Sequence, residues 1–174
     1  GSMAPGGYAW MFPKSSGANI GLGIQRRFAK GRSLNQYAET FISNYEGEIS
    51  FNGAGSLPMS GSIRNFVKGN YLLVGDAAGM VLPSNGAGIT IGMIGGRIAG
   101  QVIAEHLTEG TSLTEYEGRW EKQMGRVMRN SKRAFRFGNL MFRLPNWMLN
   151  MAFNRLTRGI IWRAVTCRRM FWLL

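Results

Sequence analysis

The segment "YLLVGDAAGMVLPSNGAGITIGMIGG", residues 71–96, constrains the fold more than any other part of this chain. Four adjacent apolar residues open the segment, which is the pattern of a strand buried on both faces. The strand breaks at Gly75 and Asp76, and a loop rich in proline and glycine leads into a helix predicted from about Gly86 to Leu107. This order of strand, acid, loop and helix predicts a ligand site at the carboxyl end of the strand.

The predicted helix has glycine at every fourth position, namely Gly88, Gly92, Gly96 and Gly100. Each interior glycine costs about 0.5–1 kcal/mol relative to alanine, so the stripe predicts tight packing as compensation. Glycine stripes of this spacing also occur in membrane-spanning helices. Arg97 and Gln101 interrupt the apolar run well short of the roughly 20 residues that cross a bilayer, which excludes that alternative.

Asp76 and the loop after it suit a flavin. A carboxylate at a strand end can accept hydrogen bonds from the hydroxyl groups of a ribityl or ribose chain. The helix start presents free N–H groups and the positive end of the helix dipole, which favour the negative charge of a reduced flavin. The plainer alternative makes Asp76 a turn residue and the glycines packing residues. The joint spacing favours the flavin site, whose predicted residues are Gly75, Asp76, Pro83, Gly86, Ala87, Gly88 and Ile89.

A β-hairpin is predicted near the start of the chain. Residues 6–13 form a strand pattern in which Tyr8, Trp10 and Phe12 share one face. After the turn signal "KSSG", residues 18–24 predict the antiparallel partner strand. The three aromatic side chains are either ordinary core or one wall of an apolar binding site.

The remaining elements mix helices with one irregular strand. A helix is predicted over 33–45 with Ser33 as its N-cap, and an irregular strand over 47–61. A long basic helix follows over 112–143, broken near Gly138, and a basic, aromatic-rich helical region runs to the end of the chain. This mixture predicts the α+β class, or a fragment of a larger α/β assembly.

The net charge of +12 lies in the last third of the chain. Residues 119–174 hold 13 Lys and Arg against Glu121 alone, whereas residues 1–118 hold eight charges of each sign. Such asymmetry predicts a polyanionic partner. The aromatic residues among these cations favour an anionic membrane surface over nucleic acid, because no helix-turn-helix, RNA-recognition or zinc-finger pattern is present. A solvated basic surface is the plain alternative.

One histidine and one cysteine exclude several kinds of site. Cys167 has no second cysteine for a disulfide, a redox pair or a zinc site. His106 is expected near a helix end, as a cap or surface residue. We therefore predict no metal site.

Two stretches carry a resemblance to known flavoproteins. The first, "GDAAGMVLPSNGAGI", resembles the second flavin-binding motif of the glutathione-reductase-like flavoproteins, which include aromatic hydroxylases and halogenases. The second, "APGGYAWMFPKSSGANIGLG", is similar to the YxWxFP…GxG pattern of the geranylgeranyl reductase family. Members of that family are FAD-dependent enzymes that saturate prenyl chains on archaeal lipids or chlorophyll precursors. The resemblance spans residues 4 to about 120.

The resemblance implies roles for the residues at matching positions. Asp76 would contact the ribityl chain of FAD, and the loop from Pro83 to Ile89 would lie beside the isoalloxazine ring. The implied reaction is hydride transfer from reduced FAD to a prenyl double bond, with no residue identified as the catalytic proton donor. The isoprenoid site would be lined by Tyr8, Trp10, Phe12, Pro13, Gly21 and Gly23.

The family pattern begins with a GxGxxG βαβ unit that holds the ADP pyrophosphate, and this sequence contains no such fingerprint. We therefore predict the C-terminal portion of such an enzyme, inactive and without bound FAD on its own. The predicted division is residues 1–3 (a tag-cleavage scar and the start), 4–68 (the substrate-binding sheet and helix), 69–110 (the end of the FAD domain) and 111–174 (the basic helical region).

Two other functions stay open from the sequence. One is a flavin monooxygenase or halogenase, which shares the "GDAAG" stretch, and the other is a non-catalytic lipid- or membrane-binding remnant. The predicted partners are an isoprenoid lipid, a membrane surface contacted peripherally through the basic helices, and a second copy of the chain that closes an open sheet edge. With no signal peptide in the sequence, we expect a cytoplasmic location with peripheral membrane contact.

Overall fold

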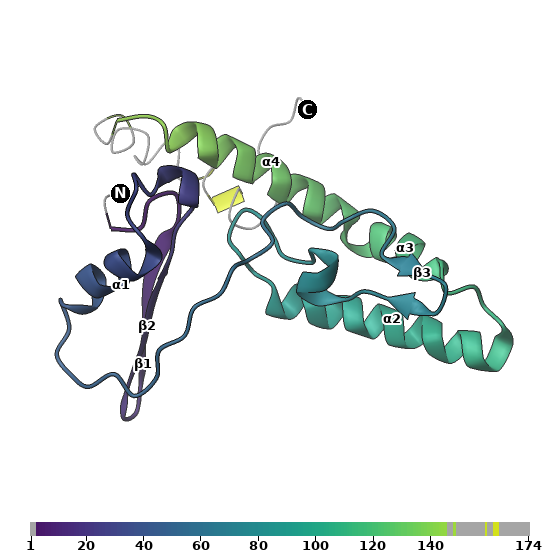
Figure 1. The fold of residues 1–174 in the computed structure, drawn as a ribbon. Helices are drawn as coiled ribbons and strands as arrows, with labels where there is room; N and C mark the ends of the chain where they lie inside the picture. Colours follow the sequence, from purple (N-terminus) through teal and green to yellow (C-terminus); the bar gives the residue numbers. More distant parts are fainter. Residues whose placement is uncertain (1–2, 146–147, 149–158, 160–161, 164–174) are drawn as a thin grey trace. The chain divides into compact units, whose positions relative to one another are not determined.

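A computed structural model describes residues 3–145, 148, 159, 162 and 163 of the chain. It divides into two compact units, residues 1–54 and 55–174, and each is described by itself (Figure 1). Helices and two small antiparallel sheets make up the described part, so the class is α+β, as predicted. The helical region predicted after Pro145 lies outside the described residues, as does Cys167. The functional division of the chain at residues 68 and 110 stays a prediction.

The first unit is built on the predicted hairpin. Strand β1 (Tyr8–Lys14) pairs antiparallel with β2 (Gly17–Gly23), and Trp10 lies opposite Gly21. A short 3₁₀ turn, η1 (Arg26–Phe28), leads to helix α1 (Leu34–Ile42). Ser33 caps α1 as predicted, because its hydroxyl accepts from the Gln36 N–H while the Gln36 side chain accepts from the Ser33 N–H.

One face of the hairpin packs on α1. The buried cluster contains Leu22 from β2 with Tyr37 and Phe41 from α1, and Ala9 of β1 packs against it. The Tyr37 hydroxyl donates to the carbonyl oxygen of Ala29 at 2.9 Å, which satisfies the polar group in this core. Since side chains alternate along a strand, this packing leaves the aromatic residues of β1 on the opposite face.

The predicted irregular strand is wrong, because residues 47–61, which span the boundary between the two units, form no strand. Several glycines and Pro58 lie in this segment, and they disfavour a regular ladder. The first regular elements of the second unit are the two-residue strands β3 (Val67–Lys68) and β4 (Tyr71–Leu72), which pair antiparallel.

The predicted strand buried on both faces is also wrong. Tyr71 is 82% exposed and Leu73 is exposed too, whereas Leu72 and Val74 are partly buried. The alternating exposure shows that only one face of the segment is covered, and among the described residues β4 pairs with β3 alone. An unbroken apolar run was therefore insufficient to predict two-sided burial.

Helix α2 (Ile89–Glu109) starts three residues later than predicted, because Gly86 has a left-handed φ of 75° and belongs to the preceding loop. The turn η2 (Gly75–Ala78) packs on the first turns of α2. The predicted tight packing along the glycine stripe is found only at this end of the helix. An added Cβ on Gly92 would lie 3.4 Å from the Gly75 Cα, but one on Gly100 would meet nothing within 4 Å. Tight packing falls instead on Gly95, where a Cβ would lie 2.5 Å from the Met80 sulfur.

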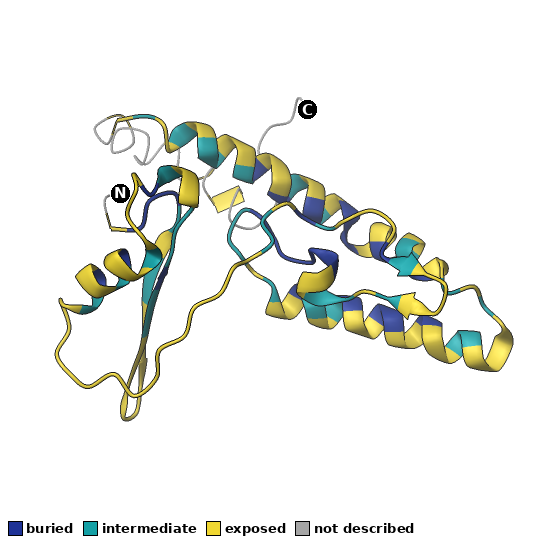
Figure 2. Cartoon of the chain, in the orientation of Figure 1, coloured by how far each residue is buried: buried dark blue, intermediate teal, exposed yellow. Residues whose placement is uncertain are grey.

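Helix α2 has a buried face and an exposed face (Figure 2), and each carries a line of apolar residues. One face enters the core of the second unit through Ile91, Gly95, Ile98, Ala99 and Val102. The other is exposed and advances in steps of four and three residues, as expected for one line along a helix. We call this line the apolar row, and its members are Ile89, Met93, Gly96, Gly100, Ile103 and Leu107.

The long basic helix has an internal π-helical turn rather than a break near Gly138. Helix α3 (Glu115–Trp120) runs into the π turn η3 (Glu121–Gly125), and α4 (Arg126–Met141) continues through Gly138. The buried residues Tyr116, Trp120, Met124 and Met128 recur every four positions. In a regular α-helix each such step drifts by about 40° around the axis, and the wider π turn keeps the series on one face.

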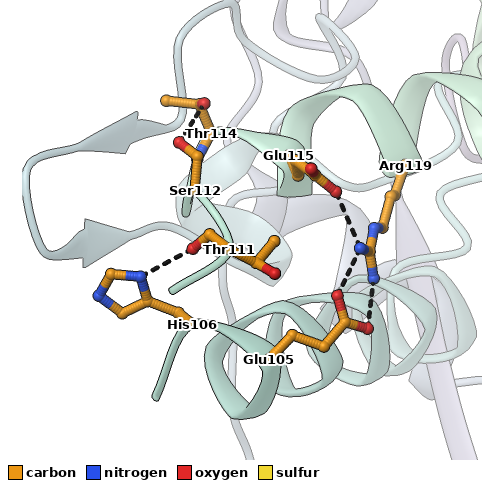
Figure 3. A network of polar contacts seen from close by, with 7 residues as sticks. All are labelled: Glu105, His106, Thr111, Ser112, Thr114, Glu115 and Arg119. Atoms are coloured by element: carbon orange, nitrogen blue, oxygen red, sulfur yellow. Dashed lines mark hydrogen bonds and ion pairs between the residues drawn. The ribbon is translucent and has the colours of Figure 1, made fainter. Parts of the chain in front are cut away.

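A polar network joins α2 to α3 (Figure 3). The Arg119 guanidinium donates to Glu105 at 2.7 Å and to Glu115 at 2.8 Å. The hydrogen bond from Arg119 holds the pKa of the Glu105 carboxyl below its usual value. His106 near the end of α2 makes a 2.8 Å hydrogen bond through Nδ1 with the Thr111 carbonyl oxygen, which confirms it as a helix-end residue.

Candidate functional site

Asp76 lies beside the start of α2. Gly75 and Gly79 have left-handed φ angles of 65°, and the Met80 N–H donates to the Gly75 carbonyl oxygen at 2.9 Å. This bond and the two left-handed glycines fold the chain tightly around Asp76, which is exposed. A Cβ added to Gly88 would lie 3.4 Å from Asp76 Oδ1, so the carboxylate lies against the helix cap. Asp76 therefore lies within the short turn η2, rather than ending a long strand directly.

The loop between Asp76 and α2 is fixed by its own hydrogen bonds. The Leu82 N–H donates to the Ala87 carbonyl oxygen at 2.9 Å, and the Gly86 N–H returns to the Leu82 carbonyl oxygen at 2.8 Å. The Ala87 N–H donates to Asn85 Oδ1 at 3.0 Å. Pro83 is fully buried and anchors the loop. Sequence reasoning had put Pro83 in the flavin site, and that role stays a prediction.

Ser131 is a residue of this site that the sequence analysis missed. Its hydroxyl accepts from the Ser84 N–H and donates to the Ser84 hydroxyl, both at 3.0 Å. Ser131 is fully buried on α4, between Met128 and Ala134 on the same face. A small polar residue within that otherwise apolar face was the signal that could have identified it.

The start of α2 has no side-chain cap. Gly88 occupies the N-cap position, no side-chain oxygen accepts from the first turn, and the first turn holds no acid. The first N–H groups of a helix have no partner within the helix, and they carry partial positive charge. A Cβ on Gly88 would also come within 3.2 Å of Val81, so the backbone is bare where it meets Asp76. A carboxylate acceptor beside an uncapped helix start fits a ligand with hydroxyl and anionic groups, as FAD has.

The aromatic face of the hairpin forms a separate feature in the first unit. The ring centroids of Tyr8 and Trp10 lie 5.8 Å apart, and those of Trp10 and Phe12 lie 6.5 Å apart. Tyr8 and Phe12 are 55% and 61% exposed, which overturns the alternative that this row is ordinary core of the unit. Pro13, at the end of the row, is exposed as well.

Glycines on β2 make room for this row. A Cβ on Gly21 would collide with the Trp10 indole, so the indole lies directly on the backbone of the neighbouring strand. Gly23 lies opposite Tyr8, and a Cβ there would meet nothing within 4 Å. Asn19, which the sequence analysis did not single out, accepts the Trp10 indole N–H at 2.9 Å and fixes its orientation. The arrangement is an apolar aromatic surface beside open backbone.

Comparison with known proteins relates most of this chain to one family. Residues 1–54 match the family model of the geranylgeranyl reductase catalytic domain. The chain is also 39% identical over 145 residues to digeranylgeranylglycerophospholipid reductase 2 of Methanothermobacter thermautotrophicus, an alignment that covers 80% of this chain and 37% of that protein. This chain belongs to the geranylgeranyl reductase family. The family prediction is thereby confirmed.

Other members extend the match along the chain. The digeranylgeranylglycerophospholipid reductase of Methanocella arvoryzae is 30% identical over 174 residues, covering 96% of this chain and 43% of its own length. A crystal structure of a geranylgeranyl bacteriochlorophyll reductase-like protein from Thermoplasma acidophilum superposes with a TM-score of 0.71 at 27% identity, covering 91% of this chain and 42% of that one. The chain thus spans about two fifths of these family members, and its place at their C-terminal end stays a prediction.

Two further observations limit other kinds of site. No group of three or more His, Cys, Asp and Glu side chains that could hold a metal ion occurs in the part of the chain that the structure describes. Within those same residues, no helix is both long enough and apolar enough to span a membrane.

Proposed function

We propose that this chain is the substrate-facing and second FAD-contacting portion of an FAD-dependent prenyl reductase. Two observations carry the proposal, the aromatic surface on the hairpin and the pairing of Asp76 with an uncapped helix start. Membership of the geranylgeranyl reductase family supports it, because the named relatives are digeranylgeranylglycerophospholipid reductases. The substrate class we propose is therefore an isoprenoid chain carried by a lipid.

FAD, when bound, supplies the hydride for the double bond. Asp76 would accept hydrogen bonds from ribityl hydroxyl groups, and Gly75 and Gly88 keep side chains away from that position. The loop residues Gly86 and Ala87, with Ile89 at the helix start, would lie along the ring. The N–H groups at the start of α2 would favour the negative charge of the reduced form. This part of the site binds and orients, and its described residues identify no proton donor.

The aromatic surface would hold the prenyl chain. Tyr8, Trp10 and Phe12 present ring faces to an apolar polyene, and contacts of this kind strengthen as water is excluded. Gly21 and Gly23 let the chain approach the strand backbone closely, while Pro13 continues the apolar surface. The structure assigns none of these side chains to proton transfer, so their expected role is to bind and position the substrate.

The family match argues against a monooxygenase or halogenase. A non-catalytic lipid-binding remnant is the competing function, and flavin binding separates it from a reductase. FAD binding by the isolated 174-residue chain is not expected, because the sequence has no GxGxxG fingerprint for the pyrophosphate. The cofactor test therefore belongs in the protein extended through its complete reading frame.

The deciding experiment measures flavin absorbance in the purified extended protein. We expect bound flavin, and we expect Asp76→Ala to weaken flavin retention about tenfold or more, in line with the loss of a charge-assisted hydrogen bond. Glu109→Ala, which removes an exposed acid at the far end of α2, is the matched control and should retain flavin. Absence of flavin from the extended protein would reject the reductase function.

The substrate surface needs its own assay. In the extended protein we expect Trp10→Ala to raise the KM for a prenylated lipid by about tenfold while flavin content stays unchanged, because a large buried contact is lost on binding. Phe51→Ala removes another aromatic of the first unit, one that is 85% exposed and lies outside the row, and should have little effect. Equal effects of the two substitutions would contradict the assigned surface.

Peripheral membrane contact through the basic region is the remaining part of the proposed function. Lipid substrates have their chains in a bilayer, so an enzyme that reduces them has to reach the membrane surface. Homodimerisation stays a prediction.

A further inference from the structure

Helix α4 carries a straight line of arginines on its exposed side. Arg126, Arg129, Arg133 and Arg136 are spaced by three, four and three residues, and all four are exposed. At about 100° per residue they fall within an arc of about 80° around the helix axis. We call these four residues the arginine row. Leu140 lies within the same arc, one step further along the helix.

The helix surface beyond the arginines turns apolar. Leu140 is 56% exposed and Phe137 is 36% exposed. The same side of the helix thus presents four guanidinium groups followed by an aliphatic and an aromatic side chain. Cations beside exposed apolar residues are the pattern of a helix that lies in a membrane interface.

The charge of the row is barely compensated. Arg129 forms an ion pair with Glu121. For Arg126, Arg133 and Arg136 no ion pair occurs within the described part of the chain. The sequence has no Asp or Glu after Glu121, so this side of α4 remains strongly cationic.

The opposite face holds α4 in place. Met128, Ser131 and Ala134 are buried in the second unit, and Ser131 bonds to Ser84 of the loop. The row is therefore presented by a packed helix, so the backbone positions of its arginines are in line before binding. Such preorganisation lowers the entropic cost of binding.

A groove opens next to the row. Its volume is about 480 Å³, and it lies between residues 61–66 and helices α3 and α4. Two of its acids are already engaged, since Glu117 accepts from the Val67 N–H at 3.0 Å and Glu121 pairs with Arg129. Arg64 and Lys132 line the same groove and have no ion pair among the described residues, so the groove adds to the positive charge.

We propose that the arginine row docks on an anionic lipid surface, with lipid phosphate groups on the guanidinium groups and Leu140 and Phe137 inserted among the headgroups. Arginine suits this role because its planar donors bind phosphate in a bidentate fashion. This proposal rests on the proposed function in one respect, because an enzyme that reduces lipid chains has to reach a membrane. Nucleic acid is the weaker candidate, because a phosphate backbone offers no apolar group for the exposed Leu140 side chain to contact.

The test is sedimentation of the purified 174-residue chain with lipid vesicles. Vesicles of phosphatidylcholine with roughly 30% phosphatidylglycerol should bind the chain, because anionic headgroups attract basic segments. Vesicles of pure phosphatidylcholine should not bind it. The variant Arg126→Gln/Arg133→Gln/Arg136→Gln should bind at least tenfold more weakly. The matched control Lys14→Gln/Arg26→Gln/Lys68→Gln removes three exposed cations elsewhere and should change binding less than threefold.

A second variant tests the apolar end of the row. Leu140→Ser/Phe137→Ser should leave binding at low salt nearly intact but remove the part that survives at 0.5 M salt, because only the electrostatic part is screened. Thermal unfolding of each variant, measured in parallel, separates loss of the surface from loss of the fold. The assay needs neither flavin nor turnover, so its result is independent of the reductase function.

Two results would overturn the proposal. One is a triple arginine variant, folded like the parent, that binds anionic vesicles as tightly as the parent does, which would assign any membrane contact to another part of the chain. The other is tighter binding of the parent to a DNA duplex than to the vesicles, lost in the triple variant, which would make the row a nucleic-acid surface.

Discussion

One exposed line of α2, the apolar row, is apolar from end to end, whereas one exposed line of α4, the arginine row, is cationic. Both helices bury one face in the same core, and both carry an exposed line of residues with steps of three and four. The apolar row of α2 includes Ile89 and Leu107, which are 85% and 78% exposed. The four arginines of α4 are also exposed, but charged side chains are favourably solvated by water.

The difference indicates what each surface requires. Burying a large aliphatic side chain contributes about 1.5–3 kcal/mol, so an apolar row this long is costly to leave in water. We expect a protein surface to cover it, and the family relatives, of which this chain spans about two fifths, are long enough to provide one. The arginine row is stable in water without a covering protein surface, and it is suited to bind a partner of opposite charge.

The sharpest test of the comparison places an acid on each face of α2. Ile98 is 2% exposed, so Ile98→Asp buries a charge and should lower the free energy of unfolding by about 4 kcal/mol or abolish folding of this unit. Leu107→Asp lies in the apolar row and should change it by less than about 0.5 kcal/mol in this chain. Urea unfolding followed by circular dichroism measures both. A large loss at Leu107 would mean that the row is covered already.

The next largest effect concerns the glycines of α2. Gly95→Ala should cost about 1–3 kcal/mol, because the new methyl group would meet the Met80 sulfur and approach the Tyr116 hydroxyl. Gly100→Ala should stabilise the helix by about 0.5–1 kcal/mol, because nothing lies near and alanine favours helix. The melting temperatures of the two variants should move in opposite directions. Movement in the same direction would contradict the described packing of this face.

Tyr116 tests the core that α2 shares with α3. Burial raises the pKa of its hydroxyl to about 12, from about 10 in an unfolded chain. Because the folded-state pKa is the higher one, the stability contribution is complete below about pH 10. It should be lost, by roughly 2 kcal/mol, as the pH rises to about 12. Thermal melts between pH 9 and 12 should therefore show a smaller decline for Tyr116→Phe than for the parent.

The smallest expected effect belongs to the arginine row itself. Arg133→Gln should change the free energy of unfolding by less than about 0.5 kcal/mol, because the side chain is exposed and forms no ion pair among the described residues. Denaturant unfolding of the variant beside the parent measures this. A clear destabilisation would show that the row serves the fold and not a partner.

Local signals in the sequence predicted the elements that depend on neighbours along the chain. The hairpin, the Ser33 cap and the helix after the glycine loop were all correct, because turn residues, capping residues and periodicity act within a few positions. The motifs for the flavin and substrate surfaces were also visible, since each is a contiguous stretch. Their family is confirmed, while the roles of the individual residues await the experiments above.

Features that depend on distant parts of the chain were harder to predict. The burial of Tyr71 was overestimated, because sequence alone does not show how many strands or layers cover a face. The contacts of Ser131 with Ser84 join residues 47 positions apart, and no local pattern marks such a pair. The predicted break near Gly138 was wrong because glycine only weakens a helix, whereas packing of the buried series favours the irregular turn at Glu121–Gly125.

The π turn has a consequence for how this helix tolerates change in length. A π turn accommodates one extra residue in a helix, so loss of one residue from Glu121–Gly125 would let α3 and α4 join as a single regular helix. Each residue after the deletion would then stay close to its present side of the helix, because the π turn already absorbs the rotation of about 100° that one extra residue would cause. The core side chains of α4 and its four arginines would therefore both keep their present sides. In homologues, a one-residue gap at this turn would leave the positively charged surface where it is, whereas a one-residue gap within α4 would rotate the residues after it by about 100°.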